Sequence, residues 1–196
     1  MTKKLCLSAS LALAALLAVA GSAAAFTATV SPAGSITSTT PTAEFIGGST
    51  TIRCALTLRG SLNASVTLIA GASLGSISRI EVGTCSGGSE VTILGLPYDL
   101  PYQGSEGTLP NEVTEVNFNV RGVSFNLGLF GGFVNCLYSG NQPSILNVAG
   151  SNPYTTETIE TEPISLRLLR GGFGCPSTGR MRATFNLSPS QRITVS

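Results

Sequence analysis

Hydrophobic and polar residues alternate with a period of two along much of this chain. Between Ile52 and Arg59, every second side chain is apolar, which places Cys54 on the apolar face. The same alternation runs through residues 115–121, 164–168 and 180–187, although Leu169 then adds an apolar side chain to the outer face. A period of two is typical of strands that are buried on one side. We therefore expect four strands here, with Cys54 pointing inward.

Weaker alternation predicts further strands between these four. They cover residues 61–70, 77–85, 90–96, 123–129, 133–139, 144–149 and 191–195. After residue 25, no segment holds apolar residues at helical spacing over a convincing length. Clusters of Gly, Pro, Ser and Asn separate the runs as turns do. The pattern predicts an all-β fold, either an antiparallel β-sandwich or a partly open barrel.

Two segments interrupt the alternation. Residues 32–41 are rich in Ser and Thr and favour an extended arm or an edge strand. Residues 97–112 contain three prolines and favour a long polar loop, because proline is excluded from regular central strands.

This second segment begins with two Leu-Pro-Tyr units around one acid. Tyr98, Asp99 and Tyr102 are the candidate surface-binding residues, since exposed tyrosines can stack on sugars or on a partner. The alternative is that both rings fold back over the end of the barrel. A different short echo, Gly131-Gly132-Phe133 and Gly171-Gly172-Phe173, precedes two cysteines and predicts two similar bulges or hairpin entries.

The first 25 residues have the pattern of an export signal. Lys3 and Lys4 precede an apolar run from Leu5 to Ala20, and three alanines end at Ala25. The run is too short for a comfortable membrane span. We expect cleavage before Phe26, one domain over residues 26–196 without a transmembrane segment, and a secreted protein that is extracellular or periplasmic.

Four cysteines remain after this signal, namely Cys54, Cys85, Cys136 and Cys175. An even number in an exported chain indicates two disulfides, although the count alone allows three connectivities. We expect Cys54–Cys85 and Cys136–Cys175, which close loops of roughly 30 and 40 residues and stabilise the fold by about 3–4 kcal/mol each. Zinc is not expected, because His and Cys-x-x-Cys pairs are absent.

Charge and composition exclude several classes of protein. After residue 25, nine Arg stand against one Asp and nine Glu, so the net charge is about −1, and the arginines are dispersed. This does not favour nucleic acid as a partner. With no His and no further Lys, Ser-His, Cys-His, Ser-Lys and Schiff-base chemistry are unavailable.

Carboxylates are the remaining candidates for catalysis or metal binding. Paired acids could come from Asp99 with Glu106, Glu112 or Glu115, or from Glu157, Glu160 and Glu162. Calcium could bind Glu157, Glu160 and nearby carbonyls. The alternative, which we favour, is that these acids are solvated charges on loops and on a polar edge strand. We therefore expect no enzymatic activity, no cofactor and no metal.

Several short motifs follow one another along the chain. They are Phe26-Thr27, Ser31-Pro32-Ala33-Gly34, Cys54-Ala55-Leu56-Thr57-Leu58-Arg59-Gly60, Val82-Gly83-Thr84-Cys85, Gly95-Leu96-Pro97-Tyr98, Val120-Arg121-Gly122-Val123, Asn135-Cys136-Leu137-Tyr138 and Cys175-Pro176. In these motifs the chain resembles the secreted bacterial "protein activator of alkane oxidation" family and related exported proteins. The resemblance implies a link to growth on hydrocarbons and to cell-surface or biofilm behaviour, and it supplies no catalytic residue.

These features predict an exported, non-enzymatic protein with a structural or adhesive role at the cell surface or in biofilm. Exposed strand edges would then support self-association or contact with cell-surface components. The alternative is a binding module for an apolar small molecule that is hydrocarbon- or lipid-like. A large, open apolar pocket would favour binding, whereas a filled core with a bare flat edge would favour assembly.

Overall fold

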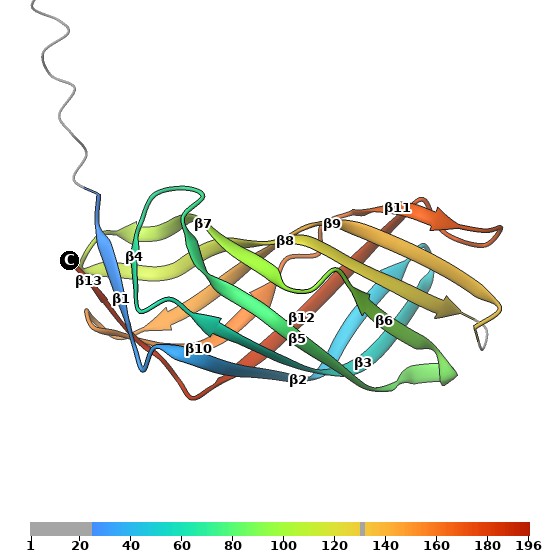
Figure 1. The fold of residues 1–196 in the computed structure, drawn as a ribbon, viewed down its shortest axis with the longest axis horizontal. Coiled ribbons are helices and arrows are strands. Elements are labelled where there is room, and N and C mark those ends of the chain that lie inside the picture. The colour runs from blue at the N-terminus through green and yellow to red at the C-terminus, as the bar shows by residue number, and fades with distance from the viewer. Residues whose placement is uncertain (1–24, 130–131) are drawn as a thin grey trace, which may run out of the picture.

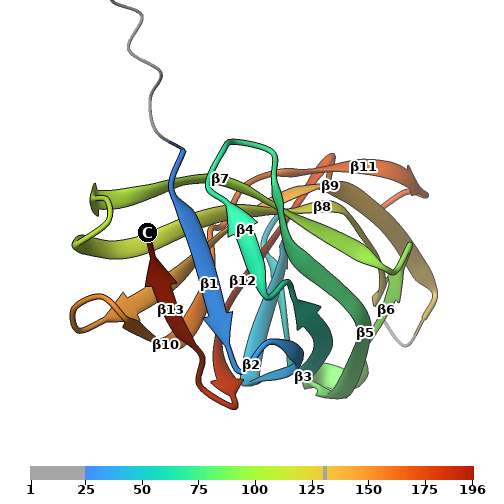
Figure 2. The ribbon, with the colours of Figure 1, turned by 60° about the vertical axis from the view of Figure 1, so that its left-hand side comes forward.

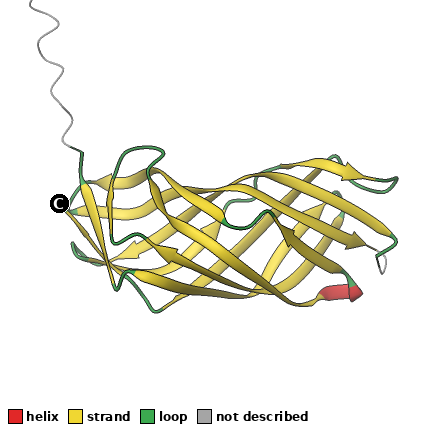
Figure 3. Ribbon diagram, in the orientation of Figure 1, coloured by secondary structure: helices red, strands yellow, loops and turns green. Residues whose placement is uncertain are grey.

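Antiparallel strands make up most of the computed structural model, which describes residues 25–129 and 132–196 (Figures 1 and 3). The strands are β1 (Thr27–Ser31), β2 (Gly34–Gly47), β3 (Thr50–Leu62), β4 (Ser65–Thr67), β5 (Ser73–Cys85), β6 (Glu90–Leu94), β7 (Tyr98–Thr108), β8 (Glu112–Leu129), β9 (Val134–Ala149), β10 (Tyr154–Thr161), β11 (Leu166–Gly171), β12 (Thr178–Ser188) and β13 (Arg192–Val195). One turn of 3-10 helix, η1 (Ser86–Gly88), follows β5. All but the last residue of the predicted export signal lies outside the described residues.

Eight of the strands are hydrogen-bonded to one another in a closed cycle. The order around this ring is β2, β3, β5, β7, β8, β9, β10 and β12, and β12 pairs again with β2. All of these pairings are antiparallel. Figure 2 shows the strands wrapping around a common axis. The predicted all-β, antiparallel architecture is confirmed, in the form of the partly open barrel.

The ring is open along part of one side. β5 pairs with β7 only from Ser73 to Ile77, and its remaining residues pair on the β3 side alone. β6 pairs only with β8. Residues 73–101 are all described, and no strand pairing joins residues 78–85 of β5 to β6 (Figure 1). We refer to this unpaired boundary as the β5–β6 seam.

The predicted inward and outward faces agree with the burial of the side chains. In β12, Met181, Ala183 and Phe185 are buried, and the intervening Arg182 side chain is exposed. Phe118 of β8 is buried as predicted. Inside the ring, Phe125 contacts the aromatic rings of two other strands, with centroids 5.1 Å from Phe45 and 5.7 Å from Tyr138.

Two of the predicted segments are wrong. Residues 32–41 contribute to β2, a central strand between β12 and β3, and residues 98–108 of the predicted loop form β7. Both strands tolerate proline because their ladders shift register beside it. The β2–β3 register shifts between Thr40 and Ala43, around Pro41, and the β5–β7 register shifts next to Pro101.

Several weaker predictions were correct in type but not in length. Residues 115–121 and 123–129 form the single strand β8, and residues 133–139 and 144–149 lie largely in the single strand β9. Of residues 61–70, only the last two residues of β3 and the three residues of β4 form strands. Among the described residues, no helix has the length and apolar character needed to cross a membrane.

The two ends of the ring differ in what lies over them. At the terminal end, β1 pairs with β4 and β13, and β13 also pairs with β10. The described chain termini meet there, since the Thr27 amide donates to the Ser196 carbonyl at 2.8 Å. At the opposite end lie η1 and the loops after β8 and β11 (Figure 1). Both cysteine pairs lie toward that end, which we call the disulfide end.

Candidate functional site at the disulfide end

Two disulfides tie the strands of this end together. Cys136 at the start of β9 bonds to Cys175 in the loop after β11, with Cα atoms 5.6 Å apart. Cys54 of β3 bonds to Cys85, its register partner at the end of β5, with Cα atoms 4.1 Å apart. The predicted connectivity is confirmed. Two disulfides indicate an oxidising, non-cytoplasmic environment.

Each Gly-Gly-Phe echo places a phenylalanine on a loop beside the second disulfide. Phe133 lies between β8 and β9 and is 92% exposed, and Phe173 lies between β11 and β12 and is fully exposed. Both loops join antiparallel neighbours, as the predicted hairpin entries require. The disulfide brings the two loops together, because Cys136 and Cys175 each lie within three residues of one phenylalanine.

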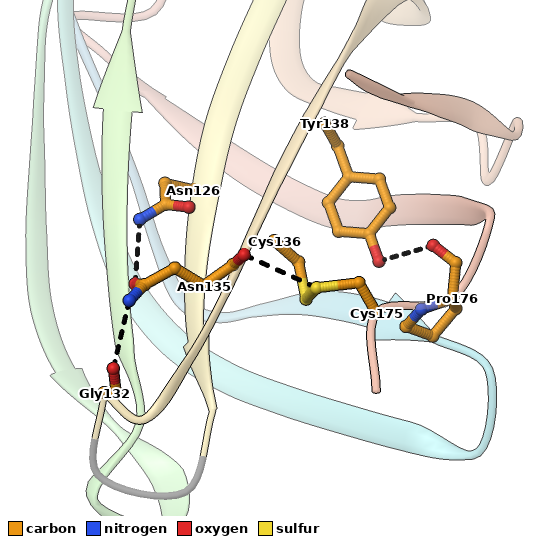
Figure 4. Close-up of a disulfide and its surroundings, with 7 residues drawn as sticks. All are labelled: Asn126, Gly132, Asn135, Cys136, Tyr138, Cys175 and Pro176. Carbon is orange, nitrogen blue, oxygen red and sulfur yellow. Dashed lines mark hydrogen bonds between the residues drawn. A yellow bond between two sulfur atoms is a disulfide. The ribbon is translucent and has the colours of Figure 1, made fainter. Parts of the chain in front are cut away.

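Hydrogen bonds hold the described residues of both loops, and Figure 4 shows those of the loop after β8. The side-chain amide nitrogen of Asn135 donates to the Gly132 carbonyl at 3.0 Å, and its side-chain oxygen accepts from the side-chain amide of Asn126 at 3.1 Å. In the second loop, the Cys175 amide donates to the Gly172 carbonyl at 3.2 Å. The two exposed rings are therefore presented on defined turns.

Glycine is needed in these loops for steric reasons. A Cβ atom on Gly171 would lie 2.6 Å from the Cys175 sulfur, so a side chain there would displace the disulfide. Gly132 has a φ of +88°, a backbone conformation that favours glycine. Each loop therefore needs a glycine, although for a different reason and at a different position of the echo.

The buried Tyr138 ring holds the loop after β11 in place. It is fully buried, and its hydroxyl donates to the Pro176 carbonyl at 3.0 Å (Figure 4). Burial raises the pKa of this hydroxyl, so it stays protonated and can donate. Gly179 packs on the same ring, where an added Cβ would lie 2.9 Å from it.

Phe133, Leu169 and Phe173 together form what we call the aromatic end. Leu169 lies at the register shift in β11, between Leu168 and Arg170, and is 58% exposed, in keeping with its position on the outer face in the sequence. Two other large apolar side chains are exposed among the described residues, and they lie elsewhere, Ile69 between β4 and β5 and Leu94 at the end of β6. The exposed apolar residues therefore concentrate on the loops and strand that flank one disulfide.

The structure does not place the predicted tyrosines at the surface. Tyr98 and Tyr102 are 2% and 4% exposed, so their rings pack inside, in line with the alternative interpretation. The Tyr98 hydroxyl donates to the Leu94 carbonyl and accepts from the Ser124 amide, which ties β6 to the start of β7. Burial raises the pKa of this hydroxyl. Asp99 is half exposed, accepts a hydrogen bond from Ser73, and lies 3.8 Å from Arg121.

The candidate acids lie apart from the aromatic end. Glu106 and Glu115 are register partners on β7 and β8, and with Glu162 they line a polar surface cleft of about 340 Å³. Glu160 accepts a hydrogen bond from Asn147. Within the described part of the chain, no three His, Cys, Asp or Glu residues are grouped to hold a metal ion.

Comparison with known proteins identifies the chain by family alone. No curated protein and no solved structure matches it. The family profile described as "Alkane oxidation protein activator PraA/PraB-like" matches residues 1–195, which is nearly the whole sequence. The chain belongs to the PraA/PraB-like family of alkane oxidation protein activators.

Proposed function

We propose that this protein is a non-enzymatic accessory protein that adheres to apolar surfaces through its aromatic end. The observation that carries the proposal is the pair of phenyl rings, one 92% exposed and one fully exposed, on two loops joined by Cys136–Cys175. The family name refers to alkane oxidation, so the apolar surface we propose is that of a hydrocarbon phase at the cell surface.

The shape of the aromatic end favours a fluid surface over a folded partner. Single exposed apolar residues are common, but clustered ones mark interaction sites. Phe133 and Phe173 lie on two loop tips, and such tips can enter a liquid apolar phase without a matching pocket. Burying each ring in such a phase contributes about 1.5–3 kcal/mol.

Strand edges give weaker support for adhesion or self-association. The outermost strands of the described sheet are β4 and β6, which have three and five residues, and the edge that β5 leaves unpaired at residues 78–85 faces β6 across the seam. Short edges offer few backbone groups to a partner strand. We therefore place contact with cell-surface components, and any self-association, at the aromatic end.

Export completes the proposal. The disulfides require an oxidising compartment, and we propose that residues 1–25 direct the chain there and are then removed. Intact mass of the material released by the native host should correspond to a chain that begins at Phe26 with four oxidised cysteines. A mass that includes the first 25 residues would contradict the export step.

Adsorption to hexadecane droplets tests the adhesive role. The double variant Phe133→Ser/Phe173→Ser should lose most of the droplet-bound protein that the wild type shows after mixing and centrifugation. The matched control is Ile69→Ser/Leu94→Ser, which removes two exposed apolar side chains outside the aromatic end and should bind like the wild type. Equal binding by all three proteins would refute the proposal.

A further inference from the structure

Three voids lie inside the ring. The first has a volume of about 60 Å³ and is lined by residues of all eight ring strands, among them Leu56, Ile77, Leu100 and Phe185. The second is about 30 Å³ and lies among side chains that include Thr156 and Leu187. The third, about 50 Å³, lies toward the terminal end, against Ala28 of β1 and Val195 of β13.

Shared walls place the voids in a row along the ring. The first and second voids share Ile36, Leu100, Phe118 and Ile159. The second and third share Leu62, Leu74 and Leu146. The walls that neighbouring voids share are thus aliphatic and aromatic side chains, which can rotate about their side-chain bonds.

The dimensions of the row favour a thin ligand. An apolar cavity of about 150 Å³ takes up a compact molecule such as benzene. Each of these voids is smaller than that, so a compact ligand does not fit any one of them. An extended chain one carbon wide would use all three, and eight-stranded rings of this kind are wide enough for one small ligand.

One polar group in the row lacks a partner. Ser38 of β2 lines the first void and is 2% exposed, and its hydroxyl has no hydrogen-bond partner. The other three hydroxyls of this void have partners. Tyr98 bonds to Leu94 and Ser124, Thr161 bonds to Ala183, and Ser144 lies 3.5 Å from the Gln142 carbonyl. A buried hydroxyl without a partner is costly, and a ligand oxygen would satisfy it.

Charge restricts the ligand further. Of the described residues that line the three voids, only Arg59 is charged, and its guanidinium is mostly exposed and pairs with Glu81 at 3.4 Å. A carboxylate in the row would be buried without a counter-ion, which is strongly unfavourable. The ligand oxygen must therefore belong to a neutral group.

We propose that the ring binds one neutral, unbranched alkyl chain that carries a single terminal oxygen, as in a primary alcohol, with this oxygen hydrogen-bonded to Ser38. The β5–β6 seam gives the chain a route inward. Ile80 and Ile93, which lie on opposite sides of the seam, are half-buried and both line the first void. Apolar side chains that are not held by a shared ladder can separate to admit a chain.

Calorimetric titration of the full mature protein with 1-octanol tests this site. The wild type should bind one 1-octanol per chain and should bind sodium octanoate at least tenfold more weakly. Ser38→Ala should weaken 1-octanol binding about three- to tenfold, the effect of one hydrogen bond. The matched control Ser35→Ala removes an exposed hydroxyl of the same strand and should bind like the wild type.

A second variant tests the row itself. Ile159→Phe fills the wall shared by the first two voids and should abolish 1-octanol binding, while its thermal midpoint without ligand shows that the protein is folded. No binding by the wild type, or equal binding by Ser38→Ala, would overturn the proposal. Phe133→Ser/Phe173→Ser should bind 1-octanol normally, so failure at this site is distinguishable from failure of the adhesive role.

Discussion

The two ends of the ring are closed by different chemistry. At the terminal end, buried polar side chains bond to the backbone. The Tyr154 hydroxyl accepts from the Val113 amide at 3.1 Å and donates to the Pro110 carbonyl at 2.8 Å, and Thr156 accepts from the Gln191 amide at 2.9 Å. At the disulfide end, one disulfide joins β3 to β5 and the other joins β9 to the loop after β11.

This difference explains why three of the five exposed large apolar side chains of the described residues gather at one end. At the terminal end, the closing segments bury their side chains to form the contacts that close the ring, as Tyr154 does. The disulfide end is held instead by the two disulfides, by Tyr138 against the loop after β11, and by glycines that let the loops approach, such as Gly171. The remaining positions, including Phe133 and Phe173, are then available for contact with other surfaces.

Removing Cys136–Cys175 should have the largest effect on stability. Cys136→Ala/Cys175→Ala opens a loop with a sequence separation of 39 residues and should lower the free energy of unfolding by about 4 kcal/mol. Urea denaturation of the variant and the wild type, both with Cys54–Cys85 intact, measures the difference. A loss below about 1 kcal/mol would mean that packing closes this end too.

Removing one buried hydroxyl compares the two ends directly. Tyr154→Phe leaves an amide and a carbonyl without their partner and should cost about 1–3 kcal/mol. Tyr138→Phe, at the disulfide end, loses a single bond to Pro176 and should cost about 0.5–1.5 kcal/mol. The same urea experiment measures both. A larger loss for Tyr138→Phe would reverse the comparison.

Acid should lower the stability that the ion pairs of Glu44 on β2 give to the ring. Glu44 of β2 accepts hydrogen bonds from Arg182 at 2.6 Å and Arg53 at 3.0 Å, and these hold its pKa below its ordinary value of 4.5. Since the folded-state pKa is the lower one, the stabilisation is present above pH 4.5 and is lost as the pH falls through the folded-state pKa.

The variant Glu44→Gln isolates this small contribution. The wild type should have the higher urea midpoint at pH 7, and the gap should narrow as the pH is lowered toward 3. Glu160→Gln, which removes a carboxylate bonded to Asn147 instead of to arginines, is the control. A gap that does not depend on pH would show that Glu44 acts through something other than its charge.

The smallest effect on stability is expected at the aromatic end. Phe133→Ser/Phe173→Ser removes side chains that are already exposed, so its free energy of unfolding should lie within about 0.5 kcal/mol of the wild type. A clear loss of stability would mean that the two phenylalanine side chains pack against the strands. Their exposure would then no longer support an adhesive role.

The alternating pattern predicts which side chains lie inside, but not which strands are neighbours. The inner face of β12 and the burial of Phe118 follow from local sequence, because a strand exposes alternate residues to opposite sides. The central position of β2 and the existence of β7 were missed because register shifts accommodate Pro41 and Pro101, and a shift depends on the partner strand. The closing pair β10–β12 likewise joins segments by contacts that no local pattern records.

The candidate sites were predictable to different degrees. The Gly-Gly-Phe echo drew attention to both loops, yet a phenylalanine before a cysteine reads equally well as a core residue, so the exposure of Phe133 and Phe173 needed the structure. The burial of Ser38 could not be predicted, because a Ser/Thr-rich stretch such as the one around it is typical of a polar surface. Its burial follows only from the position of β2 inside the ring.

The strands β1 and β13 are far apart in the sequence but neighbours in the sheet. Residues 27–31 pair with residues 192–195, and Thr27 and Ser196 exchange two backbone hydrogen bonds. In a chain that is still being made, β1 therefore has to wait for β13 before this contact can form. Contacts so distant in sequence are expected to form slowly. The terminal end is then the part of the ring that is expected to close late during folding.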